Sequence, residues 1–108
     1  MSQSIDIRPE YLATLKTLLR RYVPRAEVWA YGSRVSGGGH DAGDLDIVLR
    51  YPEEPTRSQE NLPTLKEVLS ESELPILIDV LDWARVPEDF QQEISKDYVI
   101  IQYPEAEQ

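Results

Sequence analysis

The chain has 108 residues, a formal net charge of −9 and no cysteine. This length suits one domain with a modest core, so we expect residues 1–108 to form a single domain. The negative charge argues against direct binding of nucleic acid, because phosphate backbones are bound through clustered Lys and Arg. The lack of cysteine excludes disulfides and thiolate metal sites, and it is typical of a cytoplasmic protein.

No stretch approaches the roughly 18 apolar residues that a membrane-spanning helix requires, and the start lacks the features of a signal peptide. We therefore expect a cytoplasmic protein with no membrane partner. The charge is unevenly spread, since residues 1–26 hold five basic and two acidic side chains. A solvated helix face is one interpretation of this basic segment, and a protein interface or a site for nucleotide phosphates are the alternatives.

The first predicted element is a helix that Pro9 opens and Pro24 ends. Its apolar residues recur at helical spacing and should face the core: Tyr11, Leu12, Leu15, Leu18, Leu19 and Tyr22. A short run rich in aromatic and β-branched residues, 26–31, predicts the first strand.

The rest of the chain alternates strands and helices. The expected elements are, in order, a strand over 45–49, a polar loop over 50–60, a helix over 62–69 with Asn61 as its N-cap, a strand over 75–81, a short helix from Pro87 through Ile94, an edge strand over 98–101 and a mobile tail within 102–108. This alternation predicts an α/β fold, a small mixed sheet of about three to four strands with helices packed on it.

A small turn, Gly32-Ser33-Arg34, follows the first predicted strand. Glycine lets the backbone approach an anion closely, and the Ser33 hydroxyl and nearby backbone N–H groups can donate hydrogen bonds to phosphate oxygens. The Arg34 guanidinium adds positive charge and a planar fork that suits phosphate. We predict that these three residues bind a nucleotide, the alternative being an ordinary turn.

Ten residues separate Ser33 from the sequence Asp44-Leu45-Asp46 at the start of the second strand. Side chains alternate along a strand, so Asp44 and Asp46 project to the same side, roughly 6.6 Å apart along the strand. Two neighbouring carboxylates repel each other, and a divalent cation removes that repulsion. Mg²⁺, which prefers oxygen ligands and substrate phosphates, is the metal that this pair predicts. The alternative is a solvated strand edge.

A third acid, Asp79, interrupts the apolar run 75–81, which predicts a buried central strand. An unpaired buried charge is unfavourable, so we expect Asp79 to face the metal bound by Asp44 and Asp46. The alternative is that Asp79 pairs with an arginine or caps a turn. Asp82 is expected at the strand end or in a loop.

The Gly-Ser turn, the Asp-x-Asp sequence ten residues later and the third Asp resemble the nucleotidyltransferase superfamily that includes DNA polymerase beta and the aminoglycoside nucleotidyltransferases. Over nearly its whole length the chain is most similar to the minimal nucleotidyltransferases, antitoxin partners of HEPN-domain ribonuclease toxins. The strings Ser72-Glu73-Leu74-Pro75 and Asp79-Val80-Leu81-Asp82-Trp83 also match that group. The linker with Gly37, Gly38, Gly39 and His40 is variable in related sequences, so no role is assigned to it.

The resemblance implies that Asp44, Asp46 and Asp79 form a magnesium-dependent catalytic centre in which Asp79 helps to activate the attacking hydroxyl. It implies that Gly32 and Ser33 hold the triphosphate of ATP. It further implies transfer of AMP to a tyrosine of a HEPN-domain toxin, in a hetero-oligomer, with neutralisation of the ribonuclease. Two alternatives remain: a non-catalytic module of the same fold that masks its partner, and a nucleotidyltransferase acting on a small molecule, which the short chain disfavours.

Overall fold

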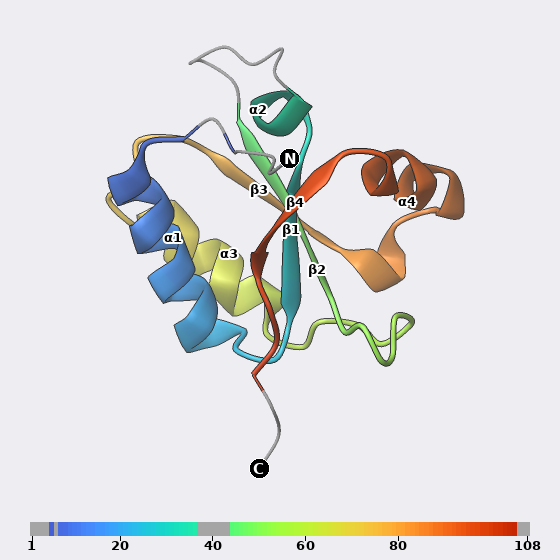
Figure 1. Cartoon of the computed structure of the whole chain (residues 1–108). Helices are drawn as coiled ribbons and strands as arrows, with labels where there is room; N and C mark the ends of the chain where they lie inside the picture. Colours follow the sequence, from blue (N-terminus) through green and yellow to red (C-terminus); the bar gives the residue numbers. More distant parts are fainter. Residues whose placement is uncertain (1–4, 6, 37–43, 106–108) are drawn as a thin grey trace.

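A computed structural model describes residues 5, 7–36 and 44–105 (Figure 1). The glycine-rich linker with His40, and residues 106–108 of the expected tail, lie outside the described residues. The sheet has the strand order β3-β2-β1-β4. Its strands are β1 (Glu27–Tyr31), β2 (Leu45–Arg50), β3 (Ile78–Asp82) and β4 (Tyr98–Gln102). Because β1 is antiparallel to β2 and β4 while β2 is parallel to β3, the predicted mixed α/β sheet is confirmed.

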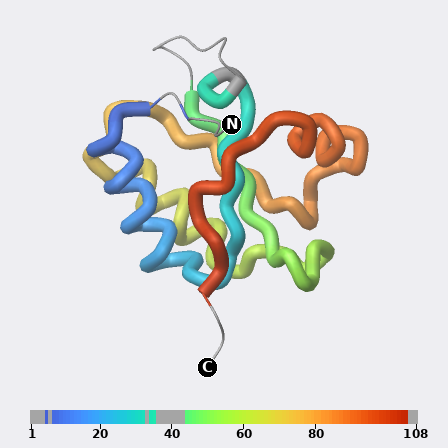
Figure 2. The backbone as a smooth tube through the Cα atoms, in the orientation of Figure 1, coloured from blue at the N-terminus to red at the C-terminus, as the bar shows by residue number. Residues whose placement is uncertain are grey.

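The helices lie on both faces of this sheet, as the backbone trace also shows (Figure 2). The helices are α1 (Pro9–Tyr22), α2 (Ser33–Ser36), α3 (Leu62–Glu71), the 3₁₀ turn η1 (Trp83–Arg85) and α4 (Glu88–Ser95). α1 and α3 cover one face, and η1 and α4 lie against the other. The one-turn helix α2 directly follows β1, where the sequence predicted only a turn.

The core on the face of α1 and α3 follows the predicted alternation of side chains. Leu45, Ile47 and Leu49 of β2 are fully buried there. They pack with the apolar stripes of the two helices, among them Leu15, Leu19, Leu65 and Leu69. Because odd-numbered residues of β2 face these helices, Asp46 and Val48 face the opposite side of the sheet.

The opposite face carries an aromatic core around an ion pair. The Trp29 ring stacks on Tyr98, with centroids 3.9 Å apart, and meets Trp83 edge to face at 5.2 Å. The Arg50 guanidinium lies over both indoles and pairs with Glu27 at 2.6 Å. Both tryptophans are nearly buried, so they are core residues and not exposed stacking platforms.

The third predicted strand differs from the expectation of a buried central strand over 75–81. β3 begins only at Ile78 and is an edge strand, hydrogen-bonded to β2 alone. Leu77, directly before it, is 73% exposed. The apolar run predicted burial, but burial of a strand depends on its neighbours in the sheet, which a local pattern does not specify.

Two further expectations differ from the structure. Asn61 stands at the N-cap of α3, but its side chain makes no capping hydrogen bond and donates to the Tyr22 carbonyl at 2.5 Å. The expected mobile tail begins too early, because Gln102 is buried in β4 and donates to the carbonyls of Val23 and Ala26, each at 2.9 Å. Glu105 is also held, since its N–H donates to the Pro24 carbonyl.

The basic face of α1 is partly used in holding the chain together. Arg20 donates to the carbonyls of Pro24 and Tyr103, both at 3.1 Å, and these contacts connect the end of α1 to the segment after β4. This supports a structural use of the helix's charge over a phosphate site. Across the described ranges, no helix is long and apolar enough to cross a membrane.

Candidate functional site

The predicted acids meet at one end of the sheet. β1 ends at Tyr31, which lies opposite Asp46 in the antiparallel register with β2. In the parallel register of β2 and β3, Asp46 lies beside Asp79. Asp44 directly precedes β2. The strand order thus brings Asp46 and Asp79 together, although they are 33 residues apart in the sequence. Both lie on the sheet face opposite α1 and α3.

The pKa of Asp46 responds to its burial and to the neighbouring acids. Partial burial raises the pKa of Asp46 above its usual range, and the negative charges of Asp79 and Asp44 raise this pKa further. Asp79 itself is exposed, so the expectation that its charge would be buried was wrong. Its place beside Asp46 follows from strand register instead.

Tyr31 is a member of this group that sequence reasoning left without a role. Its side chain is nearly buried on the same sheet face, and burial, followed by the charges of Asp46 and Asp79, raises the pKa of its hydroxyl well above the usual range. The signal in the sequence was alternation along β1, because Tyr31 shares its side of the strand with Trp29.

Gly32 lets the backbone approach the acids. Its φ is +87°, and a Cβ atom at this position would lie 2.5 Å from Asp46 Oδ2. The Gly32 carbonyl then accepts the N–H of Val35 at 3.0 Å, which starts α2. Ser33 is the first residue of α2, and its predicted hydroxyl contact lies outside the described side chains. Glycine is therefore required here for both conformation and space.

Arg34 lies apart from the acids' cavity. The residue is only 6% exposed and lines a hollow of about 360 Å³ with Ile7, Arg8, Tyr11 and Ile76. The predicted contact of its guanidinium with a nucleotide stays a prediction.

The cavity beside Asp46 has a volume of about 360 Å³. Its lining comes from the end of β1 and the glycine after it, the start of β2, the helix α4 and the turn after α4: Tyr31, Gly32, Asp46, Phe90, Glu93, Ile94 and Asp97. The sequence predicted Phe90 and Ile94 in a short helix and gave no role to Glu93 or Asp97, because only the fold brings α4 to the acids.

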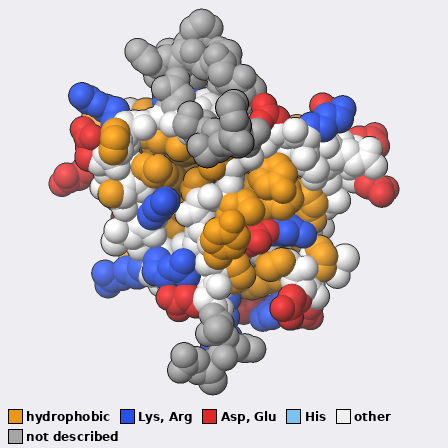
Figure 3. Space-filling view, in the orientation of Figure 1, with side chains coloured by type: hydrophobic (Ala, Val, Ile, Leu, Met, Phe, Trp, Pro, Cys, Tyr) orange, Lys and Arg blue, Asp and Glu red, His pale blue; other side chains and the backbone are white. Residues whose placement is uncertain are grey.

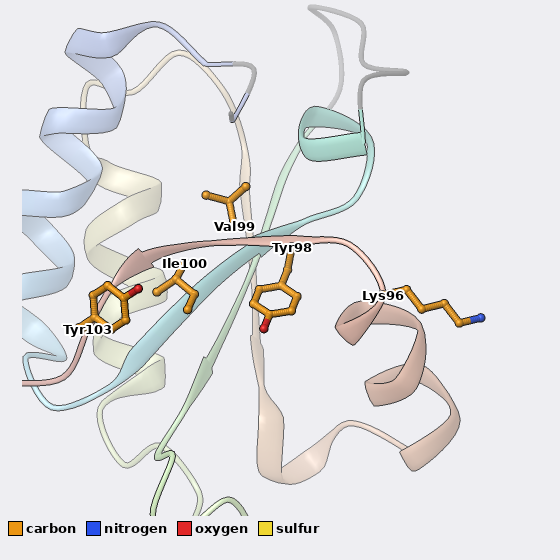
Figure 4. Close-up of a pocket in the computed structure, with 5 residues that line it drawn as sticks. All are labelled: Lys96, Tyr98, Val99, Ile100 and Tyr103. Carbon is orange, nitrogen blue, oxygen red and sulfur yellow. The ribbon is translucent and has the colours of Figure 1, made fainter. Parts of the chain in front are cut away.

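A slightly larger hollow of about 400 Å³ lies along β4, where Lys96, Tyr98, Val99, Ile100 and Tyr103 line it (Figure 4). It contains no carboxylate among these residues. We assign the chemistry to the smaller cavity, because only that one combines an acid of the predicted metal pair with the glycine turn.

The acids fit Mg²⁺ as a two-carboxylate site. Within residues 5, 7–36 and 44–105, no three His, Cys, Asp or Glu side chains are already arranged around one metal position. Mg²⁺ is usually held by one or two carboxylates and completed by substrate phosphates and water. Asp44 and Asp46 supply such hard oxygen ligands. Burial, followed by the charges of Asp79 and Asp44, raises the pKa of Asp46, and a bound cation would favour its ionised form.

Comparison with known proteins shows the family of the chain. Residues 1–88 match the family model described as the central palm domain of mitochondrial-like poly(A) RNA polymerase. The chain is 46% identical over 101 residues to a Haemophilus influenzae protein named probable protein adenylyltransferase MntA. The match covers 94% of this chain and 87% of that relative.

Two solved structures share the fold. A toxin–antitoxin structure with AMP-PNP has a TM-score of 0.68 and 20% identity. A mutant of the MntA–HpeT toxin–antitoxin has a TM-score of 0.67 and 18% identity. Each match covers 87% of this chain and 74% of the other. The chain belongs to the minimal nucleotidyltransferases of the MntA type, and it is a nucleotidyltransferase of the DNA polymerase beta-like superfamily.

Proposed function

We propose that this chain is a magnesium-dependent antitoxin that transfers AMP from ATP to a tyrosine hydroxyl of a HEPN-domain ribonuclease toxin. The name of the Haemophilus influenzae relative and the AMP-PNP in a solved relative of the same fold support AMP transfer. The observation that carries the proposal is the register that sets Asp46 beside Asp79, next to Gly32. We propose a cytoplasmic complex of antitoxin and toxin as its setting.

Each residue has a distinct role in this proposal. Asp44 and Asp46 would hold Mg²⁺, which when bound supplies charge neutralisation for the phosphates. The backbone N–H groups of Gly32 and Ser33 would hold the triphosphate of ATP. The Arg34 guanidinium, next to Ser33 in the chain, would add positive charge toward the phosphates.

Asp79 is suited to the acceptor because it is exposed beside Asp46. The tyrosine oxygen attacks the α-phosphorus, and the bond between that phosphorus and the oxygen bridging to the β-phosphate breaks. Pyrophosphate leaves, and Asp79 takes the proton of the hydroxyl or orients it for transfer. The products are a phosphodiester-linked AMP on the toxin and free pyrophosphate.

The test uses the purified chain, Mg²⁺ and the protein encoded beside its gene as the candidate toxin. ATP labelled at the α-phosphate should label the toxin, whereas ATP labelled at the γ-phosphate should not. Mass spectrometry should place the AMP on tyrosine, and ribonuclease activity should fall as AMP accumulates. Asp44→Ala, Asp46→Ala or EDTA should abolish labelling, while Glu71→Gln, which changes an exposed acid on α3, should leave it unchanged.

Other outcomes separate the alternatives. If the Asp44→Ala and Asp46→Ala variants still neutralise the toxin fully, masking of a surface explains the antitoxin activity and catalysis does not. If the native chain releases pyrophosphate only when a small hydroxyl compound is present, the acceptor is a small molecule.

A further inference from the structure

The cavity beside Asp46 has an aromatic wall that projects from α4. The rings of Tyr31 and Phe90 meet edge to face, with centroids 6.0 Å apart and planes at 82°. Tyr31 is nearly buried, whereas Phe90 is 42% exposed. Such geometry leaves ring surface available to a further aromatic group. Figure 3 shows hydrophobic side chains gathered on this side of the molecule, over the sheet beside α4.

The same cavity is lined by acids. Glu93 and Asp97 join Asp46 in its lining. Glu93 pairs with Lys96 at 3.0 Å, but both side chains are more than 60% exposed, so water screens this pair. Phosphates held away from the Mg²⁺ at Asp46 would meet repulsion from Glu93 and Asp97, on the α4 side of the cavity. An acceptor side chain flanked by lysine or arginine would be attracted by the same carboxylates.

We propose that this cavity receives the acceptor side chain, an aromatic hydroxyl carried on a Lys- or Arg-rich segment of the acceptor protein. The proposal rests on the proposed function and deepens it. Phe90 contacts the acceptor ring, and Glu93 attracts its basic flanks, so both residues determine specificity. Because Gly32 and Asp46 also line the cavity, a hydroxyl that enters past Phe90 arrives beside the phosphates.

The charge and the size of the cavity together indicate which group it receives. A volume of about 360 Å³ accommodates one aromatic side chain and part of its backbone. The nucleoside of ATP would also stack on Phe90, but it is joined to three phosphates and would bring them toward Glu93 and Asp97. The acidic lining therefore favours the acceptor over the nucleotide.

The experiment measures steady-state AMP transfer with the toxin of the proposed function and MgATP as the two varied substrates. Phe90→Ala should raise the KM for toxin about tenfold, as for a contact of roughly 1.4 kcal/mol. Phe90→Tyr keeps the ring and should stay within twofold of the native chain. Glu93→Gln should raise the KM for toxin about threefold, and added salt should reduce the difference from the native chain.

The matched control is Glu88→Gln, the same change on the same helix at a residue that does not line the cavity. It should change neither KM, and thermal melting should show that all variants fold. In every variant the KM for ATP should stay within about twofold of the native value.

The possible failures are distinguishable. A rise in the KM for ATP instead of the toxin shows that the cavity holds the nucleoside, and overturns the acceptor assignment. Unchanged values for both substrates in the Phe90→Ala variant overturn it as well. If the native chain labels no toxin under any condition, the proposed function itself fails, and the acceptor assignment fails with it.

Discussion

Asp46 occupies the space that a side chain at Gly32 would need. Its Oδ2 lies 2.5 Å from the position of a Cβ at residue 32, closer than real Cβ contacts allow. A side chain at residue 32 would therefore require the Asp46 carboxylate to move.

Gly32→Ala should destabilise the fold and nearly abolish nucleotidyl transfer. The φ of +87° alone should reduce the free energy of unfolding by about 1–2 kcal/mol. The added methyl group should also displace the Asp46 carboxylate. Urea denaturation measures the first effect, and the rate of pyrophosphate release at saturating MgATP measures the second.

A double-mutant cycle separates the two causes. In an Asp46→Ala background the clash with Oδ2 is gone, so Gly32→Ala should reduce stability only by the conformational part. A smaller loss in that background than in the native one supports direct contact, whereas equal losses would show that the two residues act independently.

Asp46→Asn should stabilise the chain at pH 7 in the absence of Mg²⁺ and ATP. The folded-state pKa of Asp46 is raised, so this carboxyl favours folding at pH values below its unfolded pKa of about 3.9. That contribution is lost as the pH rises through the folded pKa. The variant should therefore melt up to about 5 °C higher at pH 7, and the difference should shrink toward pH 4.

The control for that comparison is Glu67→Gln, which neutralises an exposed acid in the middle of α3. Its melting temperature should follow the native chain at each pH. An Asp46→Asn variant that is less stable than the native chain at pH 7 would show that Asp46 is held by favourable contacts and is not strained by its neighbours.

Asp79→Asn should reduce the rate of AMP transfer by about 10²–10⁴-fold, because an amide cannot accept the proton of the acceptor hydroxyl. Titration calorimetry with MgATP should give a dissociation constant close to the native one. Glu73→Gln, an exposed acid before β3, provides a matched control and should leave both quantities unchanged. Comparable losses of binding and turnover would assign Asp79 to metal binding alone.

Asp82→Ala should lower stability without affecting the chemistry. The Asp82 carboxylate is buried and accepts the N–H groups of Gln59 and Ala84, at 3.1 and 3.2 Å. Its loss leaves the buried Gln59 N–H without this acceptor and removes the cap of η1, which should reduce the free energy of unfolding by about 1–3 kcal/mol. Asp82→Asn should restore part of the loss, because its amide oxygen still accepts one bond. A kcat changed more than twofold below the melting temperature would contradict a purely structural role.

Local patterns in the sequence predicted the parts of the site that depend on one strand. Alternation along β2 assigned Leu45 and Ile47 to the core and Asp46 to the other face, as the structure confirms. The glycine at position 32 predicted a close approach of the backbone to an anion, and the positive φ of Gly32 agrees with a conformation that favours glycine.

Features that depend on strand order or on distant segments were not predictable in this way. Asp79 was expected to be buried because its run is apolar, yet β3 lies at the sheet edge. Asp82 looked like an ordinary strand-end residue, and its burial depends on the loop that brings Gln59 over it. Phe90 faces the cavity because α4 folds back toward β1, a long-range arrangement that helical spacing does not specify.

The parallel register of β2 and β3 makes the position of the Asp79 carboxylate depend on the hydrophobic core. Val80 is buried against α1 and α3, while its neighbour Asp79 faces the other side. A slip of β3 by one position would turn Val80 toward solvent and place the Asp79 carboxylate in the leucine-rich core. Apolar packing on one side of the strand thereby keeps the carboxylate aligned on the other side. A substitution that weakens the packing of Val80 should therefore reduce nucleotidyl transfer while the chain still folds.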